Sequence, residues 1–102
     1  MSNKINRRPT HPGAILREDT LPAIGLTQTE FAKNLGVSPR TVGELLKERS
    51  RLTVDLANRI SLALGMSPEI WLRMQQAVDL YDVQIRNAGI YRQIHQIRPI
   101  SA

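Results

Sequence analysis

The fold is decided by residues 26–47, which read LTQTEFAKNLGVSPRTVGELLK. Thr27 and Glu30 have the spacing of a capping box, in which each side chain accepts a hydrogen bond from the other residue's backbone amide. A helix is therefore predicted to begin directly after Thr27. Gly36 can take the left-handed conformation, which ends this helix after only two turns.

A second helix is predicted to begin within three residues of that end. Ser38 supplies an N-cap hydroxyl, and Pro39 follows at the first helical position, where its missing amide costs nothing. The apolar residues of this helix have the spacing i, i+3, i+4 and face inward, and they are Val42, Leu45 and Leu46. The outward face is polar and long-armed, and it carries Arg40, Thr41, Glu44 and Lys47.

Two helices joined by a tight glycine turn, the second with a polar outer face, form the helix-turn-helix arrangement. In that arrangement the second helix enters the DNA major groove, whose width of about 12 Å matches a helix with its side chains. The predicted base contacts are Arg40 to guanine, Thr41 to a thymine methyl or a base edge, and Glu44 to the cytosine amino group. The predicted phosphate contacts are Thr27, Gln28, Ser38, Lys47, Arg49 and Arg51.

A purely structural interpretation stays open for most of these residues. Tightly turned helix pairs also occur in bundles that bind no nucleic acid. Thr27 and Ser38 are already explained as caps, Glu44 can pair with a neighbouring cation, and Arg49 with Arg51 can form a solvated loop. Only Arg40 and Thr41 have no evident structural role in this interpretation.

Three further helices are predicted around this pair. Pro12 opens a short first helix that Pro22 and Gly25 end, with His11 as a cap beside the proline. Thr53 opens a fourth helix, which Gly65 ends and whose apolar stripe is Leu56, Ile60, Ala63 and Leu64. A fifth helix opens with the cap pattern Ser67-Pro68-Glu69, and Gly89 is expected to interrupt it.

The fifth helix also offers a candidate dimer interface. Its apolar residues recur at intervals of 3, 4, 3 and 4, the spacing of a coiled-coil seam, and they are Trp71, Met74, Val78, Tyr81 and Ile85. A homodimer is expected because one reading helix contacts few base pairs, and two half-sites raise affinity. The alternative for Trp71 and Met74 is that they pack on the fourth helix.

Composition bounds the remaining possibilities. The chain has 102 residues, the size of one domain, and is 41% hydrophobic but only 4% aromatic, which favours an all-α fold. The net charge of +5 is consistent with a polyanionic partner. The absence of cysteine excludes disulfides and fits a cytoplasmic protein, and no apolar run predicts a membrane helix. His11 and His95 form no ligand or nucleophile–base pattern, so we expect no metal, no small-molecule cofactor and no enzymatic activity.

Several motifs resemble a known group of proteins. Residues 28–32, 35–38, 41–42 and 63–65 look like the Xre/Cro group of prokaryotic DNA-binding domains. A narrower resemblance, to the HigA-type antitoxins (addiction-module antidote or VapI-like proteins), is carried by residues 11–13, 15–18, 26–28, 44–46, 51–53 and 67–72. The resemblance covers residues 11–83. It implies a compact five-helix bundle of the lambda-repressor-like type.

The resemblance also implies a function and its partners. Such proteins are homodimers that repress their own operon by binding a palindromic operator in double-stranded DNA, and they neutralise a RelE-like ribonuclease toxin, HigB. Carried over to this sequence, the implied DNA contacts are Gln28, Ser38, Pro39, Arg40, Thr41, Glu44 and Lys47. The chain departs from many relatives at Pro39 and at Gly43, which costs about 1 kcal/mol of helix propensity relative to alanine. The alternative function is a stand-alone or phage-type regulator without a toxin.

Three segments follow from these patterns. Residues 1–10 are predicted to be a flexible basic arm, residues 11–83 the helix-turn-helix domain, and residues 84–102 a basic extension. Six of the fourteen Lys and Arg residues lie in the two end segments. Net charge therefore favours attraction to DNA without locating the site.

Overall fold

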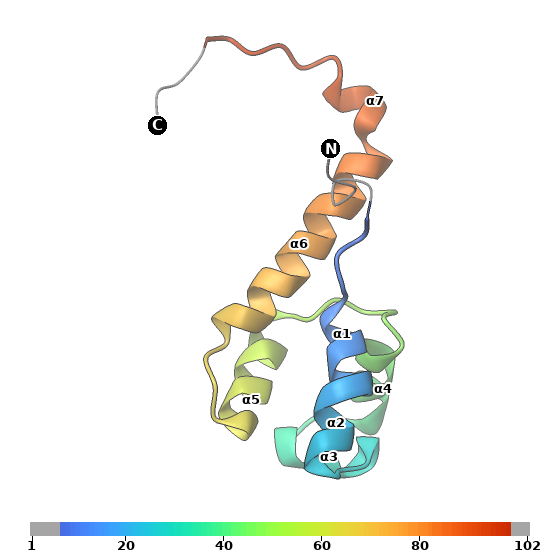
Figure 1. The fold of residues 1–102 in the computed structure, drawn as a ribbon, viewed down its shortest axis with the longest axis vertical. Helices are drawn as coiled ribbons and strands as arrows, with labels where there is room; N and C mark the ends of the chain where they lie inside the picture. The colour runs from blue at the N-terminus through green and yellow to red at the C-terminus, as the bar shows by residue number, and fades with distance from the viewer. Residues whose placement is uncertain (1–6, 99–102) are drawn as a thin grey trace.

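The computed structural model describes residues 7–98, and all of its regular elements are helices (Figure 1). The all-α prediction is confirmed. In chain order the elements are α1 (Pro12–Ile15), the π-helix η2 (Leu16–Thr20), α2 (Leu21–Ile24), α3 (Gln28–Leu35), α4 (Pro39–Leu46), α5 (Val54–Leu64), α6 (Glu69–Arg86) and α7 (Ala88–Tyr91).

The predicted first helix is present, but Pro22 does not end it. The helical path runs from Pro12 to Ile24, and Gly25, at φ 72°, ends it as expected. Proline has no amide to donate and its ring crowds the preceding turn. The π-helix η2 widens that turn, with the Leu21 amide bonded to the Leu16 carbonyl five residues back. The wider turn lets the helix continue through Pro22.

Local caps set the ends of the middle helices as the sequence predicts. Thr27 and Glu30 form the complete capping box, and Gly36 ends α3 at φ 73°. The Ser38 hydroxyl accepts from the Thr41 amide at the start of α4, and the Thr53 hydroxyl caps α5 in the same way. The His11 prediction is confirmed too, because its Nδ1 accepts from the Gly13 amide at 2.9 Å.

The core lies between α1–α2, α3, α4, α5 and the first turns of α6. Its largest fully buried side chains include Phe31, Leu16, Leu45, Leu52 and Ile60. The burial of Leu52 does not follow from helical periodicity, because this residue lies in the loop between α4 and α5. Ala63, predicted to be buried, is exposed.

The long helix α6 departs from the expected compact shape. Its first half packs on the body, and its second half projects away from it and leads to α7 (Figure 1). The described chain measures 51 × 27 × 25 Å with a radius of gyration of 16.9 Å, against about 13 Å for a compact chain of 100 residues. Pro68 is the N-cap of α6, while Ser67 bonds to the Glu69 side chain. The break after α6 falls at Asn87, and Gly89 lies inside α7, so the predicted interruption at Gly89 is wrong.

The arm before α1 is held at one point. Residues 1–6 of the predicted flexible arm lie outside the described residues. The Arg8 guanidinium donates to both carboxylate oxygens of Asp82 in α6, at 2.9 Å each. This contact spans 74 residues of sequence. It joins Arg8, a residue of the predicted basic arm, to α6.

Candidate nucleic-acid interface

Helices α3 and α4 meet across the three-residue turn 36–38 and pack closely on each other. The C-terminal end of each of these two helices is bonded to a side chain from another element. The Arg59 guanidinium of α5 donates to the Leu35 carbonyl at 2.8 Å, and the Arg17 guanidinium of η2 donates to the Leu46 carbonyl at 2.6 Å. The core therefore holds the helix pair as a rigid unit. The outward side of α4 stays exposed at Pro39, Arg40, Thr41 and Lys47.

The capping residues of the pair are engaged in the contacts that shape the helices. The Thr27 hydroxyl accepts from the Glu30 amide at 3.1 Å, and the bond back from the Thr27 amide lowers the pKa of the Glu30 carboxyl. The Ser38 and Thr41 hydroxyls lie 2.9 Å apart. Thr27, Ser38 and Thr41 are all exposed, so their oxygens lie at the protein surface beside the two helix starts.

Arg40 and Lys47 have no ion-pair partner within residues 7–98. Both are exposed, and both lie on the polar side of α4. Glu44, half-buried on the same helix, lies 3.8 Å from the Arg49 guanidinium. A cation left unpaired by the fold can bind an external anion or base edge without first breaking an internal bond. This separates Arg40 and Lys47 from the other predicted cations.

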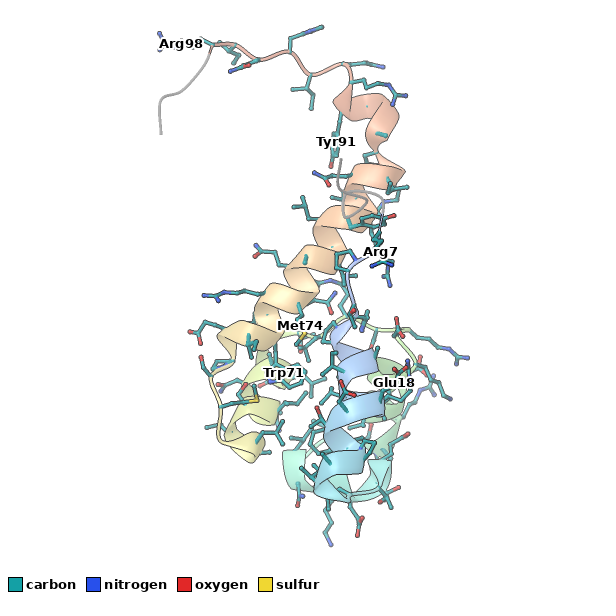
Figure 2. All side chains as sticks on the ribbon, in the orientation of Figure 1. Arg7, Glu18, Trp71, Met74, Tyr91 and Arg98 are labelled. Atoms are coloured by element: carbon teal, nitrogen blue, oxygen red, sulfur yellow. The ribbon has the colours of Figure 1, made fainter. Side chains whose placement is uncertain are left out.

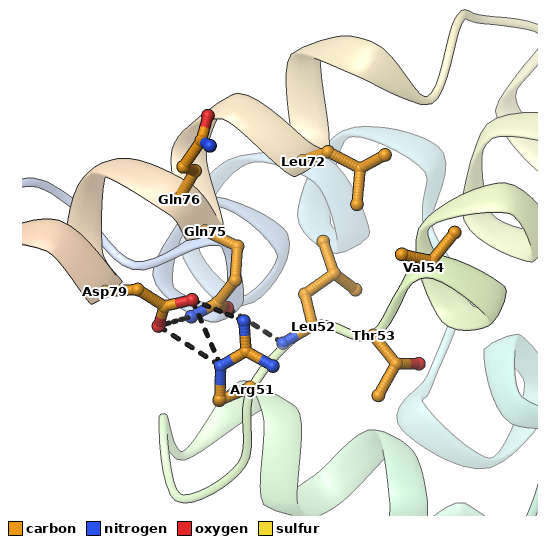
Figure 3. A pocket seen from close by; sticks show the side chains of 8 residues that line it. All are labelled: Arg51, Leu52, Thr53, Val54, Leu72, Gln75, Gln76 and Asp79. Atoms are coloured by element: carbon orange, nitrogen blue, oxygen red, sulfur yellow. Dashed lines mark hydrogen bonds and ion pairs between the residues drawn. The ribbon is translucent and has the colours of Figure 1, made fainter.

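Arg51, a predicted phosphate contact, has an ion-pair partner within the protein. Its guanidinium forms a bidentate ion pair with Asp79 of α6 (Figure 3), and the hydrogen bonds from Arg51 lower the pKa of the Asp79 carboxyl. The pair lines a hollow of about 370 Å³ between the loop after α4 and α6. Arg51 therefore fastens this loop to α6, a role that sequence reasoning missed.

The buried Gln75 of α6 also bonds to the loop that follows α4. Its Oε1 accepts from the Leu52 amide at 2.8 Å, and its Nε2 donates to Asp79 at 2.9 Å (Figure 3). The side chain is 3% exposed, yet both polar ends are satisfied. A search for apolar residues on α6 could not find it.

The predicted stripe on α6 is divided between the core and the surface. Trp71 and Val78 are 3% and 1% exposed, so they are inside the protomer and offer almost no surface to a second copy. Met74 is half-buried against the core, near Trp71 in Figure 2. Tyr81 is half-buried and Ile85 is 64% exposed. The buried face of α6 is formed by Trp71, Gln75 and Val78. Trp71 lies in the core of the protomer and Met74 packs against that core, as expected if these two residues have a structural role.

Other kinds of site are not found in the described chain. Residues 7–98 contain no group of three or more His, Cys, Asp or Glu side chains placed to hold a metal ion. Within the same range, every helix falls short of the length and apolar character needed to cross a membrane.

Comparisons with known proteins agree with this geometry. Residues 16–71 match the helix-turn-helix family HTH_3. Antitoxin HigA-1 of Vibrio cholerae is 39% identical over 83 residues, which cover 81% of this chain and 78% of that protein.

Two solved structures are similar over nearly their whole length. The antitoxin GraA in complex with its operator is 35% identical with a TM-score of 0.83, covering 91% of this chain and 95% of GraA. The Pseudomonas aeruginosa antitoxin HigA with the higBA promoter is 28% identical with a TM-score of 0.84, covering 89% of this chain and 100% of that one. On this evidence, the chain belongs to the HigA-type antitoxins of the Xre helix-turn-helix family.

Proposed function

We propose that the protein is a sequence-specific DNA-binding repressor and the antitoxin of a type II toxin–antitoxin module. The DNA-binding part rests on the exposed polar face of α4, where Arg40 and Lys47 have no ion-pair partner among residues 7–98 while the core holds the helix rigidly. Similar antitoxins have been solved with their operator or promoter DNA, which supports the same role for this chain.

In this proposal α4 reads base edges and the helix starts bind phosphates. Arg40 donates two hydrogen bonds to guanine, Thr41 contacts a thymine methyl or base edge, and Glu44 accepts from cytosine. The amides and exposed side chains at the starts of α3 and α4 donate to phosphates, aided by the helix dipoles. Lys47 and Arg49 neutralise further phosphates. Arg51 contributes indirectly, by fixing the loop that follows α4.

The DNA-binding proposal is tested by fluorescence anisotropy with a labelled duplex taken from upstream of the protein's own operon. Affinity is expected to fall steeply with added salt, with a slope of about −0.9 per neutralised phosphate. Arg40→Ala should lose about 1–3 kcal/mol and relax base preference at one position of each half-site. Equal affinity of the wild type for upstream DNA and for an unrelated duplex of the same length would contradict sequence-specific repression.

A homodimer through α6 is part of the same proposal, with the interface shifted from the core residues to the exposed ones. Ile85 is 64% exposed, and Tyr81 lies one turn before it on the same face. Ile85→Asp is expected to give a monomer in sedimentation velocity with an unchanged circular dichroism spectrum. Gln84→Asp, at the exposed neighbouring position, is the control and should stay dimeric. If the Ile85→Asp variant remains dimeric, the dimer interface does not include Ile85 and lies elsewhere on the protein.

The toxin partner rests on family membership. We propose a RelE-like ribonuclease of the HigB type, encoded next to this gene, and a cytoplasmic location, where operator DNA and toxin are both found. Co-expression tests this directly: growth should stop with the neighbouring gene alone and recover with both. If no adjacent reading frame encodes such a toxin, the stand-alone regulator is the correct interpretation.

A further inference from the structure

Gly43 occupies an unusual place in α4. A glycine inside a helix costs about 1 kcal/mol relative to alanine, so this position lowers the stability of the helix proposed to read DNA. Gly43 lies one turn after Pro39 and one turn before Lys47, which places it on the exposed side of the helix. It is nevertheless buried, although Pro39 and Lys47 are exposed. Something from another element must cover it.

The covering group is the side-chain amide of Gln28, the first residue of α3. A Cβ built on Gly43 would lie 2.6 Å from the Gln28 Nε2 and 3.5 Å from its Cδ. The same Nε2 donates to the Pro39 carbonyl at 3.0 Å. The Gln28 amide therefore lies along α4 between Pro39 and Gly43, in space that any larger residue at position 43 would fill.

This placement joins a side chain of α3 to the outer face of α4. One N–H of Nε2 is used on Pro39, and a glutamine amide has a second N–H and an acceptor oxygen. These groups suit either a phosphate oxygen or the N6/N7 edge of adenine. Gln28 is exposed, so its remaining polar atoms lie at the protein surface near the start of α4.

We propose that Gly43 is a positioning residue for DNA recognition: its missing side chain lets the Gln28 amide lie on the outer face of α4 and contact the operator. The inference rests on the proposed DNA-binding function and extends it to a residue that makes no DNA contact of its own. It also accounts for a glycine in the middle of the reading helix.

Gly43→Ala tests this because stability and binding should change in different directions. The clashing atom is the end of a flexible side chain, so Gln28 can swing away and the fold can accommodate the new methyl group. The melting temperature should stay the same or rise, since alanine favours the helix. Operator affinity should fall about tenfold to a hundredfold, the equivalent of one lost hydrogen bond to a charged or polar group in each half-site.

Gly89→Ala is the matched control. It makes the same substitution inside α7, where the nearest atom to a new Cβ is the end of the Arg92 side chain at 3.8 Å, an ordinary contact. Its operator affinity should equal that of the wild type. In ¹⁵N spectra recorded without DNA, the Gln28 side-chain amide signals should move in Gly43→Ala and stay in place in Gly89→Ala.

The double variant Gln28→Ala with Gly43→Ala separates positioning from a direct effect of the new methyl group. If Gly43 acts through Gln28, the double variant binds as weakly as Gln28→Ala alone. It also lacks the clashing side chain, so it remains informative if Gly43→Ala folds poorly. Wild-type affinity in Gly43→Ala, unmoved Gln28 signals, or losses that multiply in the double variant would each overturn the inference while leaving the proposed function intact. Failure of the wild type to bind upstream DNA would overturn both.

Discussion

Replacing Gly13 by alanine tests how closely α1 packs on α4. A Cβ at this position would lie 1.9 Å from the Leu45 carbonyl oxygen and 2.9 Å from its carbonyl carbon. These are backbone atoms inside a helix, so they cannot swing away as the Gln28 amide can. Ordinary contact begins at 3.4 Å, and the two helices would have to separate by 3.4 − 1.9 = 1.5 Å.

The expected loss of stability is large for this small domain. Overpacking typically costs about 1–3 kcal/mol, and a backbone clash belongs at the upper end of that range. Alanine has a helix propensity about 1 kcal/mol more favourable than that of glycine, so the net loss in the free energy of unfolding is about 2 kcal/mol. For about 100 residues this corresponds to a melting temperature lower by about 8–16 °C.

The measurement is thermal unfolding followed by far-ultraviolet circular dichroism and by fluorescence of Trp71, the single tryptophan of the chain. Gly89→Ala is again the control, because its Cβ meets only an ordinary contact. A Gly13→Ala melting temperature within about 2 °C of the wild type would refute the close packing of α1 on α4.

Two further predictions concern buried polar groups. Burial is the main cause that lowers the pKa of His11 in the folded state, while unfolded histidine titrates near 6.5. Protons therefore favour the unfolded chain, so stability should be full above about pH 6.5 and fall as the pH drops through the lower folded-state pKa. His11→Asn keeps a capping acceptor without that titration and should flatten the fall in urea unfolding; an unchanged pH profile would contradict this. Gln75→Leu leaves the Leu52 amide without its acceptor and should cost about 1–3 kcal/mol in the same assay, whereas Gln76→Leu, at the exposed neighbouring position, should cost much less.

The helix pair α3–α4 could be predicted because its determinants are local. A cap hydroxyl acts on an amide three residues away, and a terminal glycine acts on the turn it ends. The roles of Thr27, Ser38 and Gly36 can therefore be predicted from the few residues on either side of each. The outward face of α4 follows from the apolar spacing on its other side.

The contacts of α6 could not be predicted because their partners are distant in sequence. Gln75 is buried only because the Leu52 amide, 23 residues earlier, needs an acceptor. Arg51 and Asp79 are 28 residues apart, and each alone has the pattern of a solvated surface residue. An apolar stripe drawn through Trp71, Met74 and Val78 follows hydrophobicity, while the actual buried face includes a polar residue.

The role of Gly43 escaped sequence reasoning for a related reason. The sequence shows a residue of low helix propensity inside a helix. It does not show that the Gln28 side chain occupies the space beside Gly43. At Gly43 and at Gln75, the departure from the local pattern coincides with a contact made by another element.

The π-helix η2 bears on the length of the first helical segment. In the wide turn five residues cover nearly the same rotation as four residues of an α-helix, because the backbone bond spans five residues and not four. Deleting one residue from Leu16–Thr20 would therefore restore a regular helix and keep Pro12–Ile15 nearly in phase with Leu21–Ile24. Gly13 would still face Leu45. Substitutions at the exposed positions of this segment leave that phase unchanged as well, so we expect this wide turn to be a point where the family tolerates both new side chains and the loss of one residue.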